Sequence, residues 1–530
     1  MKTYFKIIIS LVSFLVVANA NASSFVYCSE ASPKIFNPQL ATDGPTFNAS
    51  SRTSYDRLVE FKKGATNVVP GLAESWTVSK DGLKYNFKLR KDVSFQTTKT
   101  FKPKRLFNAD DVIWSFNRMR LASHPYHKVN QGTYEYFRSM GMGKLVTDIK
   151  KINDHEVQFI LSKRESPFLS NMAMDFASIL SKEYGDKLAK MNKKEQMDLK
   201  PVGTGPFALT KYVKDTVIRY AAHPKYYKGV AKIKKLIFSI TPEPSVRFQK
   251  LKRGECHLIA EPSPNDIELM RKFPKITVKE MAGLNVGYVA LNVEKKPLNK
   301  KKVREAIRLA MNRQSYIKAI YKGYAEVAKN PIPPTIWSYN NKIKMTDYNV
   351  KKAKALLAKA GYPKGFKISL WTLPVSRPYN PNGKKMGELI QEDLKKIGIT
   401  VDLKTYKWAT YLEKASKGEH EMIQLGWTGD NGDPDNFLSV LLGCDAVKAG
   451  SNYARWCNKK FNKLVTDAKS LVSQDARANL YKKAQVIFNQ EVPWVPIAHS
   501  KVFRALRTNV KGYVMSPLGT ESFYEVSVTK

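Results

Sequence analysis

The stretch "GWTGDNGDPDNF", Gly426 to Phe437, places three carboxylates close together beside the Trp427 ring. Such a group could hold a metal ion, carry out acid/base chemistry, or present one anion to a cationic ligand. A calcium loop of the EF-hand type needs oxygen ligands at alternate positions and a Glu at position twelve. Counting from Asp430 or from Asp433 places no carboxylate at positions five and twelve. We therefore expect no metal site here and interpret Asp433 and Asp435 as turn and cap residues.

Other candidate catalytic groups lack the partners that catalysis requires. "SYIK", beginning at Ser315, has the Ser-x-x-Lys spacing of penicillin-type acyltransferases, but its companion motifs are missing. The histidines His124 and His127 of "HPYH" have no carboxylate or Cys at a sensible spacing, and His499 in "WVPIAHS" is typical of a core histidine. No His-Glu-x-x-His, Gly-x-Ser-x-Gly or phosphate-binding loop occurs. The sequence predicts a protein that is not an enzyme and needs no cofactor.

Strand-like and helix-like patterns alternate along the chain, which indicates an α/β fold. "LKYNFKLR" alternates apolar and polar residues with the period of a half-buried strand, and Asn108 opens a helix in "NADDVIWSFNRMR". Residues 350–361 predict a helix that ends at Gly361, and residues 366–404 predict a strand, a helix and a second strand. A βαβ unit of this kind favours a parallel or mixed sheet.

The N-terminus and the cysteines indicate an exported protein. Residues 1–22 have two lysines, an apolar run and a final Ala-Asn-Ala, the order of a cleaved secretory signal. Disulfides are then the default for Cys28, Cys256, Cys444 and Cys457, which allow three connectivities. The short separation of Cys444 and Cys457 favours a local bridge and leaves Cys28 for Cys256. A zinc site is the alternative, but no Cys-x-x-Cys pair occurs.

The net charge of +43 raises nucleic acid or an anionic membrane as partners. The basic residues are spread over the whole chain and are not interleaved with aromatics as in a single-strand binder. We expect a solvated cationic surface and no nucleic-acid partner.

Long strings of this sequence resemble the exported solute-binding proteins for peptides and nickel that serve ABC transporters. The strings are "VYCSEASPKIFNPQL", "VPGLAESWTVSKDGLKYNFKLRKDVSF", "FNADDVIWSFNR", "HPYHKV", "MDFASILSKEY", "PVGTGPF", "GLNVGY", "RPYNPNG" and "GWTGDNGDPDNF". The resemblance implies a two-lobed periplasmic binding protein of type II, in the peptide-binding cluster, with mixed sheets and a two-strand hinge. Lobe I would comprise residues 23–282 and 501–530, and lobe II residues 283–500.

The resemblance also implies a function and a site. The protein would capture dipeptides in the periplasm of a Gram-negative bacterium and deliver them, as a monomer, to an inner-membrane ABC permease. Asp430 would bind the peptide ammonium and Arg377 the carboxylate, and this suits an acceptor-only group and a planar fork of donors. Further ligand-binding residues would be Tyr379, Trp427, Gly426, Thr42 and Gly44. Haem or glutathione is the alternative ligand that the resemblance allows.

Overall fold

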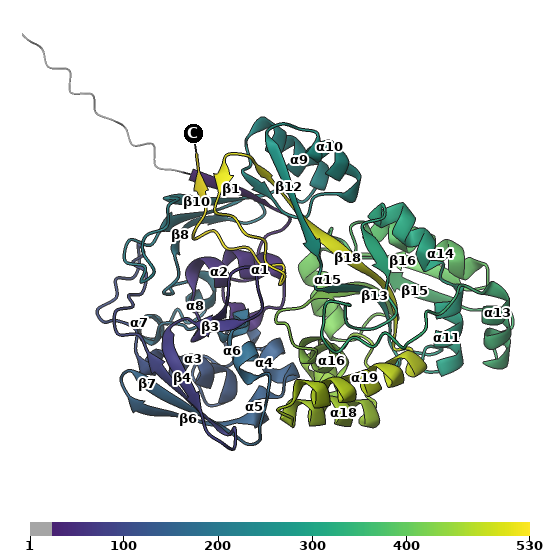
Figure 1. The fold of residues 1–530 in the computed structure, drawn as a ribbon, viewed down its shortest axis with the longest axis horizontal. Helices are drawn as coiled ribbons and strands as arrows, with labels where there is room; N and C mark the ends of the chain where they lie inside the picture. Colours follow the sequence, from purple (N-terminus) through teal and green to yellow (C-terminus); the bar gives the residue numbers. More distant parts are fainter. Residues whose placement is uncertain (1–23, 530) are drawn as a thin grey trace, which may run out of the picture.

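The computed structural model describes residues 24–529, and Figure 1 shows two bodies joined by a few long strands. The predicted signal segment, residues 1–22, lies outside the described residues. Within the described part, no helix is both long enough and apolar enough to cross a membrane. The architecture is the predicted α/β fold with mixed sheets.

One long mixed sheet runs through both bodies in the order β16-β15-β17-β13-β18-β11-β1-β10-β9-β8, and β12 and β14 also pair with β18. Pairs β1/β10, β1/β11, β15/β16 and β15/β17 are parallel, and the others are antiparallel. Its strands are β1 (Ser24–Ser29), β8 (Phe207–Val213), β9 (Val217–Ala222), β10 (Lys235–Ile240), β11 (Leu258–Ile259), β12 (Ile276–Ala282), β13 (Asn285–Leu291), β14 (Ala325–Val327), β15 (Lys367–Trp371), β16 (Thr400–Lys404), β17 (Met422–Thr428) and β18 (Trp494–Arg507).

Strand β18 changes its partner at the point where the two bodies meet. Its first half pairs with β13 through Ala498, and its second half pairs with β12 from Lys501 onward. Asn285 links the two crossing segments, because its side chain donates to Ser500 O (3.0 Å) and accepts from Ser500 N (3.0 Å). In Figure 1 β12 and β18 run between the two bodies, and β13 lies in the second body beside β18, as a two-strand hinge requires.

The body that contains the N-terminal half carries a second, antiparallel sheet in the order β4-β5-β7-β6. The predicted strand is β5, where Tyr85, Phe87 and Leu89 are buried. Helix α3 (Ala109–Arg120) follows and begins with a capping box of Asn108 and Asp111, so the predicted helix start is confirmed. The strands are β4 (Ala73–Val78), β5 (Lys84–Leu89), β6 (Val146–Asn153) and β7 (Glu156–Leu161). Two further antiparallel sheets of two strands each pair β2 (Val59–Phe61) with β3 (Val68–Pro70) and β19 (Val510–Lys511) with β20 (Ser527–Val528).

The predicted βαβ unit is confirmed in the other body. Strands β15 and β16 are parallel, and α14 (Gly383–Lys395) connects them. Its buried residues Met386, Ile390 and Leu394 recur at helical spacing and pack into one core with β15 and α13 (Val350–Lys359). The remaining helices of this body are α11 (Lys301–Ala310), α12 (Arg313–Tyr316), α15 (Trp408–Ser416), α16 (Asp435–Leu442), α17 (Cys444–Ala449), α18 (Lys459–Ser470) and α19 (Gln474–Glu491).

Short helices surround the sheets of the first body. Among them α4 (Glu135–Ser139) contacts α16 and α17 of the second body. The others are α1 (Gly44–Ala49), α2 (Ser51–Ser54), α5 (Met142–Leu145), α6 (Phe168–Met172), α7 (Lys182–Lys190), α8 (Gln196–Leu199), α9 (Pro244–Arg253) and α10 (Ile267–Arg271).

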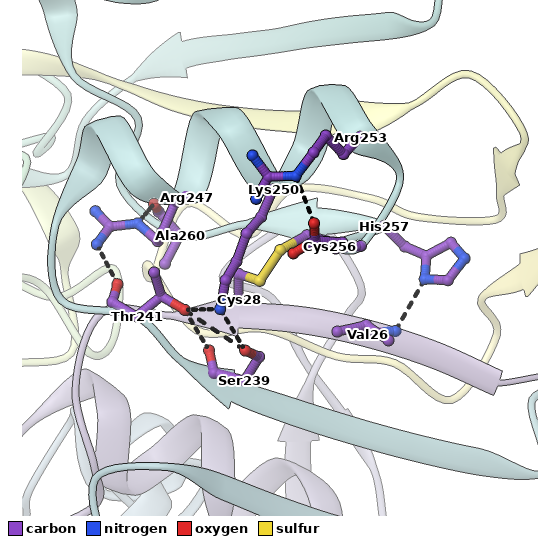
Figure 2. Close-up of a disulfide and its surroundings, with 11 residues drawn as sticks. Val26, Cys28, Ser239, Thr241, Arg247, Lys250, Arg253, Cys256, His257 and Ala260 are labelled. Atoms are coloured by element: carbon purple, nitrogen blue, oxygen red, sulfur yellow. Dashed lines mark hydrogen bonds and ion pairs between the residues drawn. A yellow bond between two sulfur atoms is a disulfide. The ribbon is translucent and has the colours of Figure 1, made fainter.

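Both predicted disulfides are present. Cys28 of β1 is bonded to Cys256, which follows α9, with a Cα–Cα distance of 5.8 Å, and Cys444 is bonded to Cys457 at 4.7 Å. Figure 2 shows the first bridge between β1 and the α9 region, where Lys250 donates to Ser239 Oγ at 3.2 Å. Each bridge joins segments on one side of the β12/β13/β18 crossing.

Candidate functional site

A cavity of about 110 Å³ lies between the two bodies. The first body supplies one wall of the cavity, from residues that precede β13 in the sequence and from residues 502–520. The second body supplies the other wall, from segments around β15 and β17. All seven residues that the sequence predicted for the ligand site line this cavity. They are Thr42, Gly44, Arg377, Tyr379, Gly426, Trp427 and Asp430.

The aspartate-rich segment forms a loop between β17 and α16, and one amide side chain organises it. The Asn436 Oδ1 accepts hydrogen bonds from the Trp427 indole (3.0 Å) and from the backbone N–H of Asp430 (2.8 Å). Both bonds are buried, so the loop holds the Trp427 ring and the start of Asp430 in fixed positions. Asn436 lies in the predicted motif, but its role was not predicted.

Asp430 presents a buried carboxylate at the cavity wall, with 8% of its surface exposed. The Tyr136 hydroxyl of α4 donates to its Oδ2 from the opposite body, and the Tyr136 ring packs edge-on against Trp427. Burial raises the pKa of Asp430 to about 7, with the hydrogen bond from Tyr136 acting in the opposite direction. A cation entering the cavity would favour the ionised form and relieve this desolvation penalty.

The neighbouring aspartates are structural, in agreement with the interpretation from sequence, but they do more than cap a turn. Asp433 accepts from the Asp435 backbone N–H (3.0 Å) and forms a buried ion pair with Arg477 (2.7 Å). Asp435 begins α16 and lies 3.8 Å from the ammonium of Lys469, which also contacts Glu165 of the other body at 3.2 Å. These ion pairs fix the loop from the side away from the cavity.

Arg377 is a cation that lines the same cavity, and it is 7% exposed. Its Nη1 forms an ion pair with Glu30 of the opposite body at 2.7 Å, and its guanidinium lies over the Trp408 ring at 4.9 Å. Within residues 24–529 its Nη2 has no hydrogen-bond partner. Burial acts to lower the pKa of Arg377, but the acidic groups around it, Glu30 first and then Tyr379, Glu261 and Asp43, together outweigh burial, and the pKa rises. One half of the guanidinium fork is thus held by the protein, and the other half lacks an acceptor.

Tyr379 and Gly426 shape the floor of the cavity. The Tyr379 ring packs so closely on Gly426 that a Cβ there would approach the ring Cδ2 at 2.2 Å, so only glycine fits. The Tyr379 carbonyl accepts from the Tyr321 hydroxyl at 2.6 Å, which fixes the backbone that carries Arg377. On the opposite wall, Thr42 donates to Glu135 at 3.3 Å, and Gly44 is the first residue of α1.

Several cavity residues were missed because no local pattern marks them. Glu30 and Tyr136 reach Arg377 and Asp430 across sequence separations of 347 and 294. Glu30, Asp43 and Trp408 line the cavity, whereas Tyr136 contacts the lining residue Asp430. Glu30 falls in "VYCSEASP", one of the strings that carry the family resemblance, and that is the signal by which it could have been found.

The groups that the sequence analysis set aside lie in structural positions. His499 is buried, and its Nδ1 pairs with Asn285 O (2.9 Å). His127 Nδ1 pairs with Arg118 O (2.8 Å), and His124 packs edge-on against Trp114. Ser315 donates to Asn312 O within the start of α12. The described residues contain no cluster of three or more His, Cys, Asp or Glu side chains that could hold a metal ion.

A cavity between two bodies that are joined by a two-strand hinge, closed by contacts between those bodies and lined by a carboxylate and a guanidinium, defines a two-lobed solute-binding protein. Residues 67–449 match the family of bacterial extracellular solute-binding proteins, family 5, middle part. The chain belongs to this family of solute-binding proteins.

Similar proteins cover the chain nearly from end to end. It is 51% identical to the dipeptide-binding protein of Escherichia coli K12 over 99% of this chain and 98% of that protein. It is 48% identical to heme-binding protein A of Haemophilus influenzae over 96% and 93% of the two chains. The crystal structure of a dipeptide-binding protein from Pseudoalteromonas sp. SM9913 in complex with Met-Leu has 39% identity and a TM-score of 0.93, over 96% of this chain and 100% of that one. The type II peptide-binding fold expected from the resemblance is thereby confirmed.

Proposed function

We propose that the protein is a dipeptide receptor of the periplasm, which closes over its ligand and delivers it to an inner-membrane ABC permease. The observation that carries the proposal concerns one small interlobe cavity, which is lined by the buried carboxylate of Asp430 and by the guanidinium of Arg377. Within residues 24–529, Asp430 forms no ion pair and Arg377 Nη2 has no hydrogen-bond partner. The dipeptide-binding relatives support the same ligand class. Export with cleavage after residue 22 and a monomeric state belong to the proposal.

The two charged ends give a physical basis for selecting dipeptides. Every unblocked dipeptide carries one ammonium and one carboxylate, separated by a nearly constant length of backbone. Asp430 would accept from the three-donor ammonium, and the free Nη2 of Arg377 would donate to the carboxylate. Because a closed site excludes water, a misplaced or missing terminus would leave a buried charge unpaired. Chain length is thus selected by the charged ends, and side chains contribute less.

The lobe division follows from the crossing strands and forms part of the proposal. Lobe I comprises residues 23–282 and 501–530, and lobe II comprises residues 283–500; residues 23 and 530 lie outside the described range. The change of partner along β18 and the link from Asn285 to Ser500 support a hinge at residues 282–285 and 498–501. Opening about this hinge would separate Glu30 from Arg377 and Tyr136 from Asp430.

Isothermal titration of the purified protein with Ala-Ala tests the function. Asp430→Ala should weaken binding by about two to three decades or more, since removing one partner of a buried charge pair costs about 3–5 kcal/mol. Asp475→Ala removes the same charge at an exposed position of α19 and is the matched control. Equal affinities of Asp430→Ala and wild type would contradict the assignment.

Haem is a second candidate ligand, because the Haemophilus influenzae relative is described as a heme-binding protein. The cavity volume favours a dipeptide, since about 110 Å³ is below the roughly 300–1,000 Å³ that drug-sized ligands occupy. Titration with haemin, followed by its visible absorbance and repeated with saturating Ala-Ala, separates the two ligands. Haemin binding that Ala-Ala displaces would favour haem at this same site. Glutathione binding stays a prediction.

A further inference from the structure

The charge of the cavity is opposite to the charge of the protein. The chain as a whole carries +43, with 89 lysines and arginines. No lysine is among the described residues that line the cavity, where the charged groups are the carboxylates of Glu30, Asp43, Glu261 and Asp430 and the guanidiniums of Arg377 and Arg504. Carboxylates therefore outnumber cations among the described residues that line the proposed ligand cavity.

The two arginines do not neutralise all of these carboxylates. Arg504 is bound by Glu521 through Nε and lies 3.3 Å from Glu261 through Nη1. Arg377 is paired with Glu30. Neither Asp430 nor Asp43 has an ion-pair partner within the residues that the structure describes. A zwitterionic dipeptide would supply one ammonium, which Asp430 takes, and its carboxylate would bind Arg377.

Asp43 is then left as a buried acceptor with no cation. It caps α1 by accepting from the Thr46 backbone N–H through Oδ1 at 3.1 Å, and only 6% of its surface is exposed. Its other oxygen, Oδ2, is buried and has no hydrogen-bond partner in the described part of the chain. The cap uses one oxygen only, so the second is available to a ligand.

The surroundings of Asp43 agree with this assignment. Burial raises its pKa, because the hydrogen bonds from Thr46 and the more distant charges of Arg377 and the exposed Lys34 compensate only in part. A carboxyl that is desolvated and lacks a counter-ion gains most from a cationic partner.

We infer that Asp43 is a third charged contact of the ligand site, which selects dipeptides bearing a lysine or arginine side chain. This inference rests on the proposed dipeptide function and names the ligand class within it. The side chain's ammonium or guanidinium would donate to Asp43 Oδ2 while the termini occupy Asp430 and Arg377. A ligand with a net positive charge would then match a cavity in which carboxylates are in excess, and an acidic side chain would be repelled.

Isothermal titration with Ala-Ala, Ala-Lys, Lys-Ala and Ala-Glu tests the inference. For the wild type, at least one lysine dipeptide should bind about tenfold or more tightly than Ala-Ala, the effect of one added charged hydrogen bond, and Ala-Glu should bind more weakly. Asp43→Asn should reduce the ratio of lysine-dipeptide to Ala-Ala affinity to within about threefold. Asparagine is as good an N-cap as aspartate, so α1 is retained, and circular dichroism checks the fold.

Asp475→Asn makes the same change in net charge at an exposed position and should keep the wild-type ratio. Equal affinities of the wild type for Ala-Ala and both lysine dipeptides would overturn the inference, as would a preference that survives in Asp43→Asn. If Ala-Ala binds without any lysine preference, only this inference fails. If none of the dipeptides binds, the proposed function fails together with it.

Discussion

Dipeptide affinity should depend on pH through the buried carboxyl of Asp430. In the ligand-free cavity burial raises its pKa to about 7, so near pH 7 about half of the molecules hold a proton there. An ammonium ligand requires the ionised form, and binding below pH 7 must therefore release one proton. At pH 5 about one molecule in a hundred is ionised, so affinity should be about 50-fold weaker than at pH 7, or about 2.3 kcal/mol.

The alkaline limb has a different origin, since a free α-amino group has a pKa of about 7.7–8.0 and loses its charge above that range. The affinity for Ala-Ala should therefore be highest between about pH 7 and 8. Below pH 7 the folding stability of the ligand-free protein depends on pH in the opposite direction to the ligand affinity. A carboxyl whose pKa is raised on folding contributes its stabilisation at low pH and loses it as pH rises from its ordinary value of 3.8 toward 7.

Titration calorimetry between pH 5 and 8.5, in buffers of different ionisation enthalpy, measures both the affinity and the number of protons released. Glu165 is the matched control, because burial also raises its pKa to about 7 but it contacts Lys469 outside the cavity. Asp430→Asn should remove the acid limb, and Glu165→Gln should retain it. Between pH 5 and 7, a constant affinity or proton uptake on binding would refute the reasoning.

Three further predictions concern the remaining charged contacts and one disulfide. Arg377→Lys keeps the positive charge but loses the planar guanidinium, which binds Glu30 through Nη1 while it offers Nη2 to the ligand. Calorimetry should show that Ala-Ala binds this variant about 10- to 100-fold more weakly, and an affinity within twofold of wild type would show that the guanidinium is not needed. Lys469→Met leaves the buried carboxylates of Glu165 and Asp435 without their shared cation, so the free energy of unfolding, measured with urea, should fall by about 3–5 kcal/mol at pH 8. At pH 5.5 the Glu165 carboxyl is protonated and the loss should be smaller, so equal losses at both pH values would count against this prediction. Cys444→Ser opens a loop of 13 residues and should lower the free energy of unfolding by about 3 kcal/mol, whereas an unchanged melting temperature would mean that the bridge to Cys457 contributes nothing.

Local signals in the sequence were enough to predict several elements of this fold. The capping box at Asn108 and the alternation through Tyr85, Phe87 and Leu89 depend on neighbours along the chain, so they can be seen without a structure. The βαβ unit around α14 follows from the same kind of periodicity. The Cys444–Cys457 bridge was favoured by its short separation, and the other pair followed because no further cysteine remained.

The site itself was predictable only where a family motif marked it. Asp430 and Arg377 lie in recognisable strings, but their partners Tyr136 and Glu30 approach them only when the two bodies meet. No periodicity or capping rule can reveal such contacts, because they depend on tertiary closure. The excess of carboxylates in the cavity was hidden for the same reason, since the sequence as a whole is strongly basic and only the folded chain shows that no described lysine lines the cavity.

The central claim is that the cavity recognises the two charged ends of a dipeptide. The most direct measurement compares the affinities of Ala-Ala, N-acetyl-Ala-Ala and Ala-Ala-amide for the wild-type protein at pH 7.5. Removing either terminal charge leaves Asp430 or Arg377 buried without its partner, so each blocked peptide should bind at least about a hundredfold more weakly than Ala-Ala. Affinities within about threefold of each other would contradict the account, because ligand recognition would then not depend on the termini.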